Sequence, residues 1–181
     1  TRHALDMIDS VHEVAPKHPA ELVMAYSMKN ILEARSGPQK RIAVLIGVEG
    51  GHAIEGDIRV LRDFYRLGAR YMTLTWANSN ELGQSSGDLT QDQNGKPKDP
   101  GLTEFGRDVV REMNRLGMMV DISHVSDRSF YHALVVSRSP VIASHSSSRA
   151  ITNHPRNMTD DMLIALARNG AGARRLMSFC I

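Results

Sequence analysis

The chain has 181 residues, of which 41% are hydrophobic and 23% charged, which is enough apolar material to bury the core of a folded domain. Lysine and arginine are scattered, few aromatic residues accompany them and the net charge is only +2, so the sequence gives little support for nucleic-acid binding. No apolar run approaches the roughly 18 residues of a membrane span, and the single cysteine excludes an internal disulfide and leaves the cellular compartment open.

Residues 1–40 predict two helices. The first carries an apolar face until Pro16 and Pro19 interrupt it, and a second apolar stripe resumes after Ala20. The segment Ser36-Gly37-Pro38 then closes this region. The apolar positions of the two stripes are Ala4, Leu5, Ile8 and Val11, followed by Leu22, Val23, Tyr26, Ile31 and Leu32.

The run from Ile42 to Val48 predicts a buried strand that leads directly into Glu49-Gly50-Gly51-His52. A carboxylate at the end of an apolar strand, followed by two glycines, indicates a ligand site, because glycine allows backbone to turn sharply or a ligand to approach closely. The alternative is that Glu49 caps the following helix or forms an ion pair there. His52 is either a further ligand or, as we favour, a donor that orients one.

The next elements repeat the order of strand and helix. An amphipathic helix is expected over 57–68, a strand over 71–75 that ends at Trp76, and a long surface loop over 81–100. Thr103 is then the expected N-cap of a helix that leads to the next strand.

Two apolar runs, Gly117 to His124 and Pro140 to His145, each end on Ser-His, and a helical segment over 127–137 connects them. Neutral imidazole is the commonest protein metal ligand and a suitable proton-transfer group near neutral pH. Either histidine alone is more often a hydrogen-bonded loop residue, but two at equivalent strand ends are expected to face one another.

After His145 the chain passes Arg149 and Arg156, which are candidates for holding a carboxylate or phosphate or are surface charges, and a helix over 160–167 follows. Four successive strand–helix units predict an α/β fold with parallel strands and outer helices. We favour a TIM-like (β/α)8 barrel over an open doubly wound sheet, because the candidate site residues follow four different strands. A complete barrel needs about 250 residues, so the barrel is partial.

Six ordered segments together resemble the membrane dipeptidase (renal dipeptidase) family of zinc peptidases, over roughly residues 42–169. The resemblance implies a TIM-like barrel that holds two zinc ions and hydrolyses dipeptides, and dimers are common in that family. The segments are Gly47-Val-Glu-Gly-Gly-His52, Tyr71-Met-Thr-Leu-Thr75, Met113-Asn-Arg-Leu-Gly117, Asp121-Ile-Ser-His124, Ala143-Ser-His-Ser-Ser147 and His154-Pro-Arg-Asn157.

The resemblance also implies roles for individual residues. Glu49 matches the catalytic carboxylate that bridges both metals, His124 and His145 match the imidazoles on the second zinc, and Arg156 matches the arginine that binds the terminal carboxylate of the substrate. Trp76 stands where the family has a substrate-contacting histidine. A His-x-Asp pair from a first strand and an aspartate from a late strand are absent from the sequence, so the chain has ligands for about one zinc ion.

These considerations predict one incomplete dipeptidase-like barrel domain over 1–181, with a helical lead-in at 1–40, a family-like core at 41–169 and an atypical, arginine-containing tail at 170–181. A truncated or frameshifted reading would give such a tail. The leading hypothesis is zinc-dependent dipeptide hydrolysis, impaired to the extent that site residues are absent, with a dipeptide as partner and a homodimer as a further possibility. The alternatives are a degenerate, non-catalytic barrel fragment for binding or assembly, and a metal-free phosphate-handling enzyme that uses Arg149 and Arg156.

Overall fold

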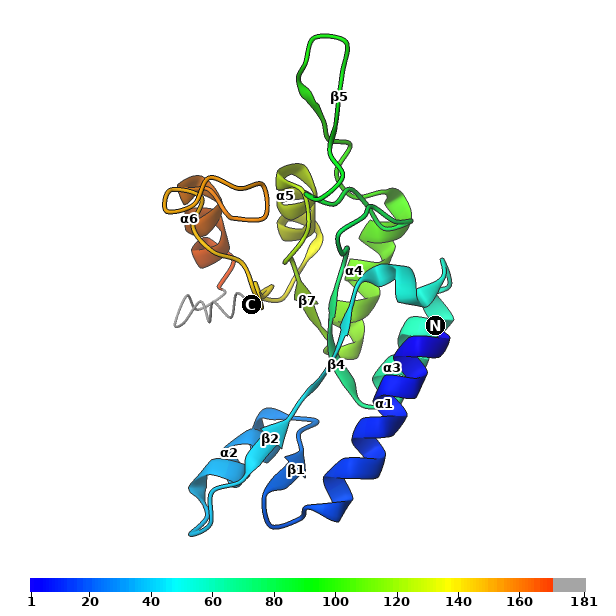
Figure 1. The fold of residues 1–181 in the computed structure, drawn as a ribbon, viewed down its shortest axis with the longest axis vertical. Helices are drawn as coiled ribbons and strands as arrows, with labels where there is room; N and C mark the ends of the chain where they lie inside the picture. Colours follow the sequence, from blue (N-terminus) through cyan, green and yellow to red (C-terminus); the bar gives the residue numbers. More distant parts are fainter. Residues whose placement is uncertain (171–181) are drawn as a thin grey trace.

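Short parallel strands covered by helices make up the computed structural model, which describes residues 1–170 (Figure 1). The expected tail therefore lies, except for Gly170, outside the described residues. Two 3-10 helical turns, Ala15–Lys17 and Gly51–Ile54, accompany the main elements. The helices are α1 (Arg2–Val14), α2 (Met28–Ser36), α3 (Ile58–Arg66), α4 (Glu104–Leu116), α5 (Asp127–Val136) and α6 (Asp160–Arg168), and the strands are β1 (Leu22–Met24), β2 (Ile42–Val44), β3 (Ile46–Glu49), β4 (Ala69–Thr73), β5 (Thr90–Gln91), β6 (Pro97–Lys98) and β7 (Met119–Asp121).

The central sheet has the order β3-β4-β7, and both of its pairings are parallel. Its register aligns Glu49 with Thr73 and Thr73 with Asp121, so the last residues of the three strands lie side by side. Parallel strands present their carboxyl ends at one edge, and this edge is where the candidate site residues follow. β1 and β2 form a separate parallel pair.

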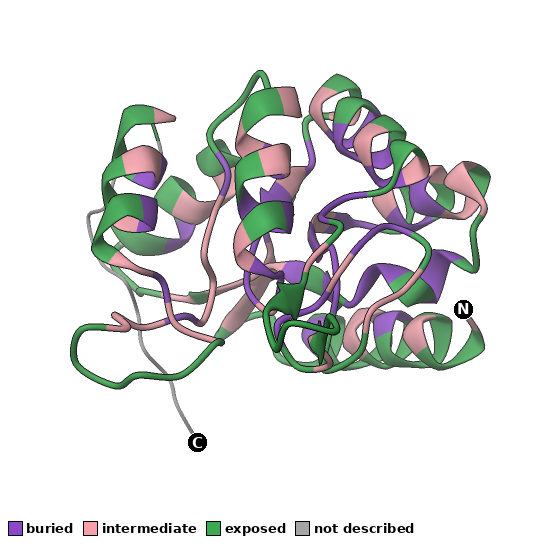
Figure 2. Cartoon of the chain, turned by 90° about the horizontal axis from the view of Figure 1, so that it is seen from above, coloured by how far each residue is buried: buried purple, intermediate pink, exposed green. Residues whose placement is uncertain are grey.

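The helices pack in series on the outer side of the sheet. α3 contacts β4 and α4, α4 contacts β7 and α5, and α5 contacts α6. Figure 2 shows buried residues on the inward sides of these helices and exposed residues on their outer sides. Each large apolar side chain fully buried here contributes roughly 1.5–3 kcal/mol to folding. They include Leu61, Phe64, Met72, Val109, Val110, Met113 and Phe130.

Polar side chains set where the helices begin. Five of the helices start after a residue whose side chain accepts a hydrogen bond from a backbone N–H of the first turn, which satisfies a donor that the helix itself leaves unpaired. The expected cap at Thr103 is confirmed, and Gly117, with φ of 77°, ends α4 in the left-handed conformation that favours glycine. The five capping residues are Ser27, Asp57, Thr103, Ser126 and Thr159.

The lead-in differs from the expectation of two helices alone. α1 and α2 are present, but Leu22 and Val23 belong to the short strand β1, which pairs with β2. The strand expected over 42–48 is divided at Leu45 into β2 and β3, and its first residue, Ile42, is 66% exposed. The two halves pair with different partners, β1 and β4.

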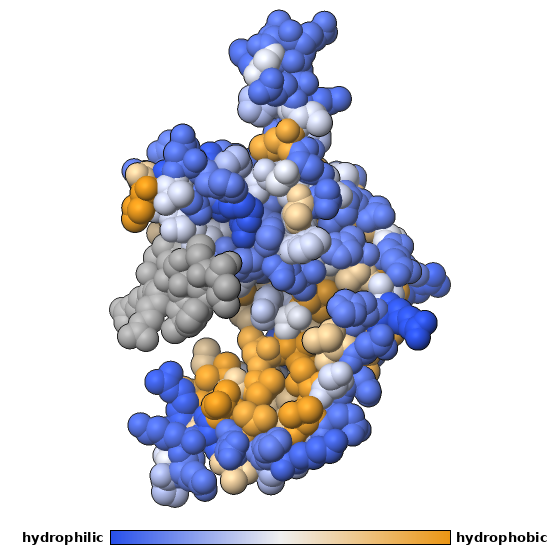
Figure 3. Space-filling model, viewed as in Figure 1, coloured by the Kyte–Doolittle hydropathy of each residue, from blue (hydrophilic) through white to orange (hydrophobic). Residues whose placement is uncertain are grey.

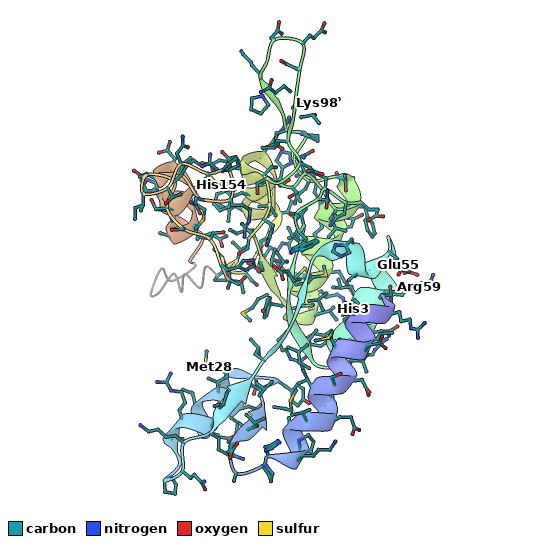
Figure 4. The ribbon with its side chains drawn as sticks, viewed as in Figure 1. His3, Met28, Glu55, Arg59, Lys98 and His154 are labelled. Atoms are coloured by element: carbon teal, nitrogen blue, oxygen red, sulfur yellow. The ribbon has the colours of Figure 1, made fainter. Side chains whose placement is uncertain are left out.

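Two later segments also differ in detail. The loop over 81–100 contains the antiparallel pair β5–β6, which projects from the body of the molecule and carries Lys98 (Figures 1 and 4). The strand expected before His145 is reduced to a parallel bridge between Ile142 and Asp121. Its backbone bonds join Ile142 to Val120 and Ile122, so the segment still lies beside β7 and places His145 next to His124.

Apolar side chains gather on the side of the molecule between α1 and β2 (Figure 3). A cavity of about 670 Å³ there is lined by Met7, Ile8, Val11 and Val44 and extends to Glu49. Among the helices within residues 1–170, none combines the length and the hydropathy that crossing a bilayer requires.

Candidate metal centre

Glu49 is the last residue of β3, and the backbone beyond it stays attached to the sheet. The N–H groups of Gly50 and Gly51 donate to the carbonyls of Thr73 and Leu74 at 3.2 and 3.1 Å. Gly50 has φ of 100°, and a Cβ at Gly51 would lie 2.6 Å from the Leu74 carbonyl oxygen. The two glycines therefore allow a turn in close contact with β4 directly after the carboxylate.

His124 lies in an unusual backbone conformation just after β7. Its φ is 69°, in the left-handed region that non-glycine residues rarely adopt, and such outliers concentrate at functional sites. Its carbonyl accepts hydrogen bonds from the backbone N–H and the hydroxyl of Ser86, at 2.8 and 3.0 Å, and from Ser85 Oγ at 3.1 Å. The loop that follows β4 thus holds His124 in place.

The structure brings Glu49, His124 and His145 together. Glu49 Oε1 lies 3.0 Å from His124 Nε2 and 3.0 Å from His145 Nε2, and the two nitrogens are 2.8 Å apart. Three donor atoms thus form a nearly equilateral triangle.

This triangle fits one divalent cation. Zinc with bonds of 2.0–2.1 Å in tetrahedral geometry separates neighbouring donors by roughly 3.3 Å, so the three atoms need to move apart by only a few tenths of an ångström. Burial of the imidazole, followed by the positive charge of Arg156 and the neighbouring His145, lowers the pKa of His124. The neutral form that can bind a metal is therefore favoured.

A buried aspartate supports the two histidine loops. Asp121 ends β7, is fully buried and accepts hydrogen bonds from Thr73 of β4, from Ser123 before His124 and from Ser144 before His145. Sequence reasoning assigned no role to Asp121 or Ser144. The signal was present, since a small polar residue precedes each histidine and an aspartate stands three residues before His124.

Of the two candidate arginines, only Arg156 lies at this centre. Its guanidinium donates to the carbonyl of His145 at 3.2 Å, while His154, two residues before it, is exposed (Figure 4). Arg149 instead forms a paired contact with Asp127, at 2.8 and 2.6 Å, and this contact raises the pKa of Arg149. The guanidinium of Arg149 is thus engaged by Asp127, and a role of Arg149 in holding a substrate anion stays a prediction.

His52 and Trp76 border the centre without joining the triangle. The ring of His52 lies beside Gly50, and both His52 and Glu49 line the cavity described above. Trp76 is 48% exposed, and its Cβ lies next to Gly50 in the turn that follows Glu49.

Comparison with known sequences gives a consistent assignment. The model of the membrane dipeptidase family (peptidase family M19) matches residues 1–172. Dipeptidase verJ of Clonostachys rogersoniana is 42% identical over 170 residues, which are 93% of this chain and 42% of that protein. Human dipeptidase 3 is 41% identical over 169 residues, 93% of this chain and 33% of that protein. The chain thus spans between a third and about two fifths of the length of these curated relatives.

Comparison with solved structures confirms the fold class. A Pseudomonas aeruginosa amidohydrolase superposes with a TM-score of 0.84 at 27% identity, covering 94% of this chain and 49% of that one. A Rhodobacter sphaeroides metallopeptidase, crystallised with a phosphinate mimic of the dipeptide L-Ala-D-Ala, gives a TM-score of 0.81 at 25% identity over 92% and 46% of the two chains. The architecture is a partial TIM-like barrel, and the chain belongs to the membrane dipeptidase family, peptidase family M19.

Proposed function

We propose that this chain carries a zinc centre for the hydrolysis of dipeptides. The observation that carries the proposal is the triangle of Glu49 Oε1, His124 Nε2 and His145 Nε2, three donor atoms with edges of 2.8–3.0 Å at one edge of the sheet. One carboxylate and two imidazoles form a donor set that suits zinc and leaves a coordination position open, as in catalytic sites. Similarity to dipeptidases and to a metallopeptidase bound to a dipeptide mimic supports the substrate class.

The side chains would divide the work as follows. A bound divalent cation supplies Lewis-acid polarisation of the scissile carbonyl and makes a water molecule more acidic. Glu49 would hold the cation, and its half-exposed carboxylate would serve as the proton acceptor. His124 and His145 bind in their neutral forms, and Arg156, adjacent to His145, binds the terminal carboxylate of the substrate. These residues are enough for one cation, and the two-zinc arrangement needs ligands beyond those three.

Metal binding and turnover together test this proposal. After dialysis against a chelator, zinc binding is measured by competition with a chromophoric chelator, and dipeptide cleavage by release of free amino acid. We expect about one zinc per chain, with binding lost in His124→Ala and His145→Ala and retained in His154→Ala, the matched control because His154 is exposed and outside the triangle. Glu49→Gln is expected to abolish turnover. Absence of zinc binding by the wild-type chain, or unchanged binding after loss of both histidines, would refute the proposal.

Trp76 favours a second candidate, a barrel fragment that binds metal without catalysis. Its Cβ lies beside Gly50, next to the turn after Glu49, and the resemblance places a histidine at this position. An indole N–H only donates and cannot move a proton, so polarisation of the reacting carbonyl from this side is weakened. Stoichiometric zinc with no turnover would favour this candidate, and gain of turnover in Trp76→His would attribute the loss to that one residue. Self-association as a homodimer stays a prediction, which sedimentation velocity can test.

A further inference from the structure

Asp121 is completely buried, and four hydrogen bonds satisfy its carboxylate. Oδ1 accepts from the backbone N–H groups of Ser123 and Ser144 at 3.1 and 3.0 Å. Oδ2 accepts from Thr73 Oγ1 at 2.7 Å and from Ser144 Oγ at 2.5 Å. The two oxygens therefore have different partners: backbone amides on one side and hydroxyl groups on the other.

Ser144 Oγ has two further partners, Ser123 Oγ at 3.3 Å and His145 Nδ1. Ser144 Oγ lies 2.7 Å from His145 Nδ1, on the opposite side of the imidazole from the Nε2 atom of the donor triangle. An ionised carboxylate only accepts hydrogen bonds, so the single hydroxyl proton of Ser144 must point to Asp121. The hydroxyl oxygen is then left as an acceptor, and His145 Nδ1 must carry the proton. His145 Nε2 consequently keeps its lone pair, which is the form that binds a cation.

We propose that Asp121, acting through Ser144, is a positioning residue that fixes the tautomer of His145 for metal binding. The importance of this tautomer rests on the proposed zinc centre. The hydrogen-bond relay that sets it, from Asp121 through Ser144 Oγ to His145 Nδ1, is already present in the protein without metal. Outer partners of ligating histidines commonly act in this way, fixing the ring and raising its basicity.

His124 gives an internal comparison. Its Nδ1 is buried and has no hydrogen-bond partner within residues 1–170, so no neighbour of that kind fixes its tautomer. Its Nε2 faces both Glu49 Oε1 and His145 Nε2. Because both of these are acceptors when the relay is in place, His124 of the metal-free protein is expected to carry its proton on Nε2. The relay thus acts on one of the two imidazoles.

Replacement of Asp121 by asparagine is expected to reverse the relay. The amide oxygen must remain on the side of the two backbone N–H donors, so the NH2 group replaces Oδ2 and faces the hydroxyls of Thr73 and Ser144. The NH2 group then donates to Ser144 Oγ, and the hydroxyl proton of Ser144 turns toward His145 Nδ1, which is closer at 2.7 Å than Ser123 Oγ at 3.3 Å. His145 therefore shifts its own proton to Nε2, where it points into the triangle and opposes cation binding.

Nitrogen NMR can measure the shift of the His145 proton between Nδ1 and Nε2 in the metal-free protein. Long-range ¹H–¹⁵N correlation spectra of histidine-labelled, metal-free protein, at about pH 8 where imidazoles are neutral, distinguish the two tautomers. We expect His145 to be protonated on Nδ1 in the wild type and on Nε2 in Asp121→Asn, with a loss of zinc affinity of roughly 10- to 100-fold. The matched control is Thr73→Val, which removes the other hydroxyl bond to Oδ2 but keeps the relay, and it should leave the tautomer unchanged.

Two results would overturn the proposal: a wild-type His145 protonated on Nε2, or a folded Asp121→Asn protein whose His145 still carries its proton on Nδ1. If Asp121→Asn does not fold, Ser144→Ala decides, because it removes the relay while leaving the aspartate in place. An unchanged tautomer in that variant would equally reject the idea. If the wild-type chain bound no zinc, the proposed function would fail, and the tautomer measurement would still test the relay.

Discussion

Glu112 allows a stability prediction with a defined pH dependence. It lies on α4 with its side chain only 9% exposed, between Arg62 of α3 and Arg115 of its own helix. Arg62 donates at 2.5 Å, and Arg115 donates twice at 2.7 Å. The hydrogen bonds from Arg115, together with that from Arg62, outweigh burial and lower the pKa of Glu112 from 4.5 to about 2. The carboxylate therefore stabilises the contact between α3 and α4 when it is ionised.

The magnitude follows from the difference in pKa between the folded and unfolded states. Each pKa unit corresponds to about 1.4 kcal/mol, so the fall from 4.5 to about 2 sets an upper limit of about 3 kcal/mol. Solvent reaches both guanidinium groups, with 37% of Arg62 and 63% of Arg115 exposed, which screens the interaction. We therefore expect Glu112→Gln to lower the free energy of unfolding by about 1–2 kcal/mol at neutral pH.

Urea denaturation between neutral pH and about pH 3 provides the assay. Because the folded pKa lies below the unfolded value, the contribution is complete above about 4.5 and declines as the pH falls toward about 2. The difference between wild type and Glu112→Gln should therefore shrink on acidification. The control is Glu104→Gln on the same helix, since Glu104 is 74% exposed and its ion pairs should contribute less than about 0.5 kcal/mol. Equal losses in the two variants, or a difference that is independent of pH, would refute this reasoning.

Three further predictions concern packing, capping and metal. Gly106→Ala should lower the free energy of unfolding by about 1–3 kcal/mol in the same urea assay, because the new Cβ would lie 1.9 Å from the Leu82 carbonyl oxygen. A loss below about 0.5 kcal/mol would contradict this packing. Thr103→Ala should cost about 1 kcal/mol through loss of the N-cap bond to Gly106, whereas Thr103→Ser should stay near wild type. Zinc should raise the Tm of the wild-type protein in a concentration-dependent manner and leave that of His145→Ala unchanged, so an equal shift in both would place the metal elsewhere.

Sequence patterns predicted the helices and the convergence of the site well, for identifiable reasons. α4 has a strong start signal in Thr103 and apolar residues at helical spacing. Glu49 and His124 converge because both follow parallel strands, whose carboxyl ends share one edge whatever the detailed register. Position along the chain was therefore sufficient to place them together.

Other features depended on contacts that sequence spacing does not encode. β1 has only three residues, and its apolar pair, Leu22 and Val23, also fits a helical stripe. The pairing of Arg149 with Asp127 joins residues 22 positions apart, and nothing near either one indicates the partner. The bonds of Asp121 likewise join β4, β7 and the segment before His145, so they could be identified only after those elements were placed.

The ultraviolet absorbance of Tyr71 can report cation binding at this site. Gly47 has no side chain, and a Cβ there would lie 1.9 Å from the Tyr71 ring, so the ring can lie over the strand that leads to Glu49. Burial, followed by the negative charges of Asp121 and Glu49, raises the pKa of Tyr71. A cation that neutralises Glu49 should therefore make this phenol easier to ionise, and the ultraviolet absorbance of tyrosinate would register its arrival with no dye or label attached to the protein.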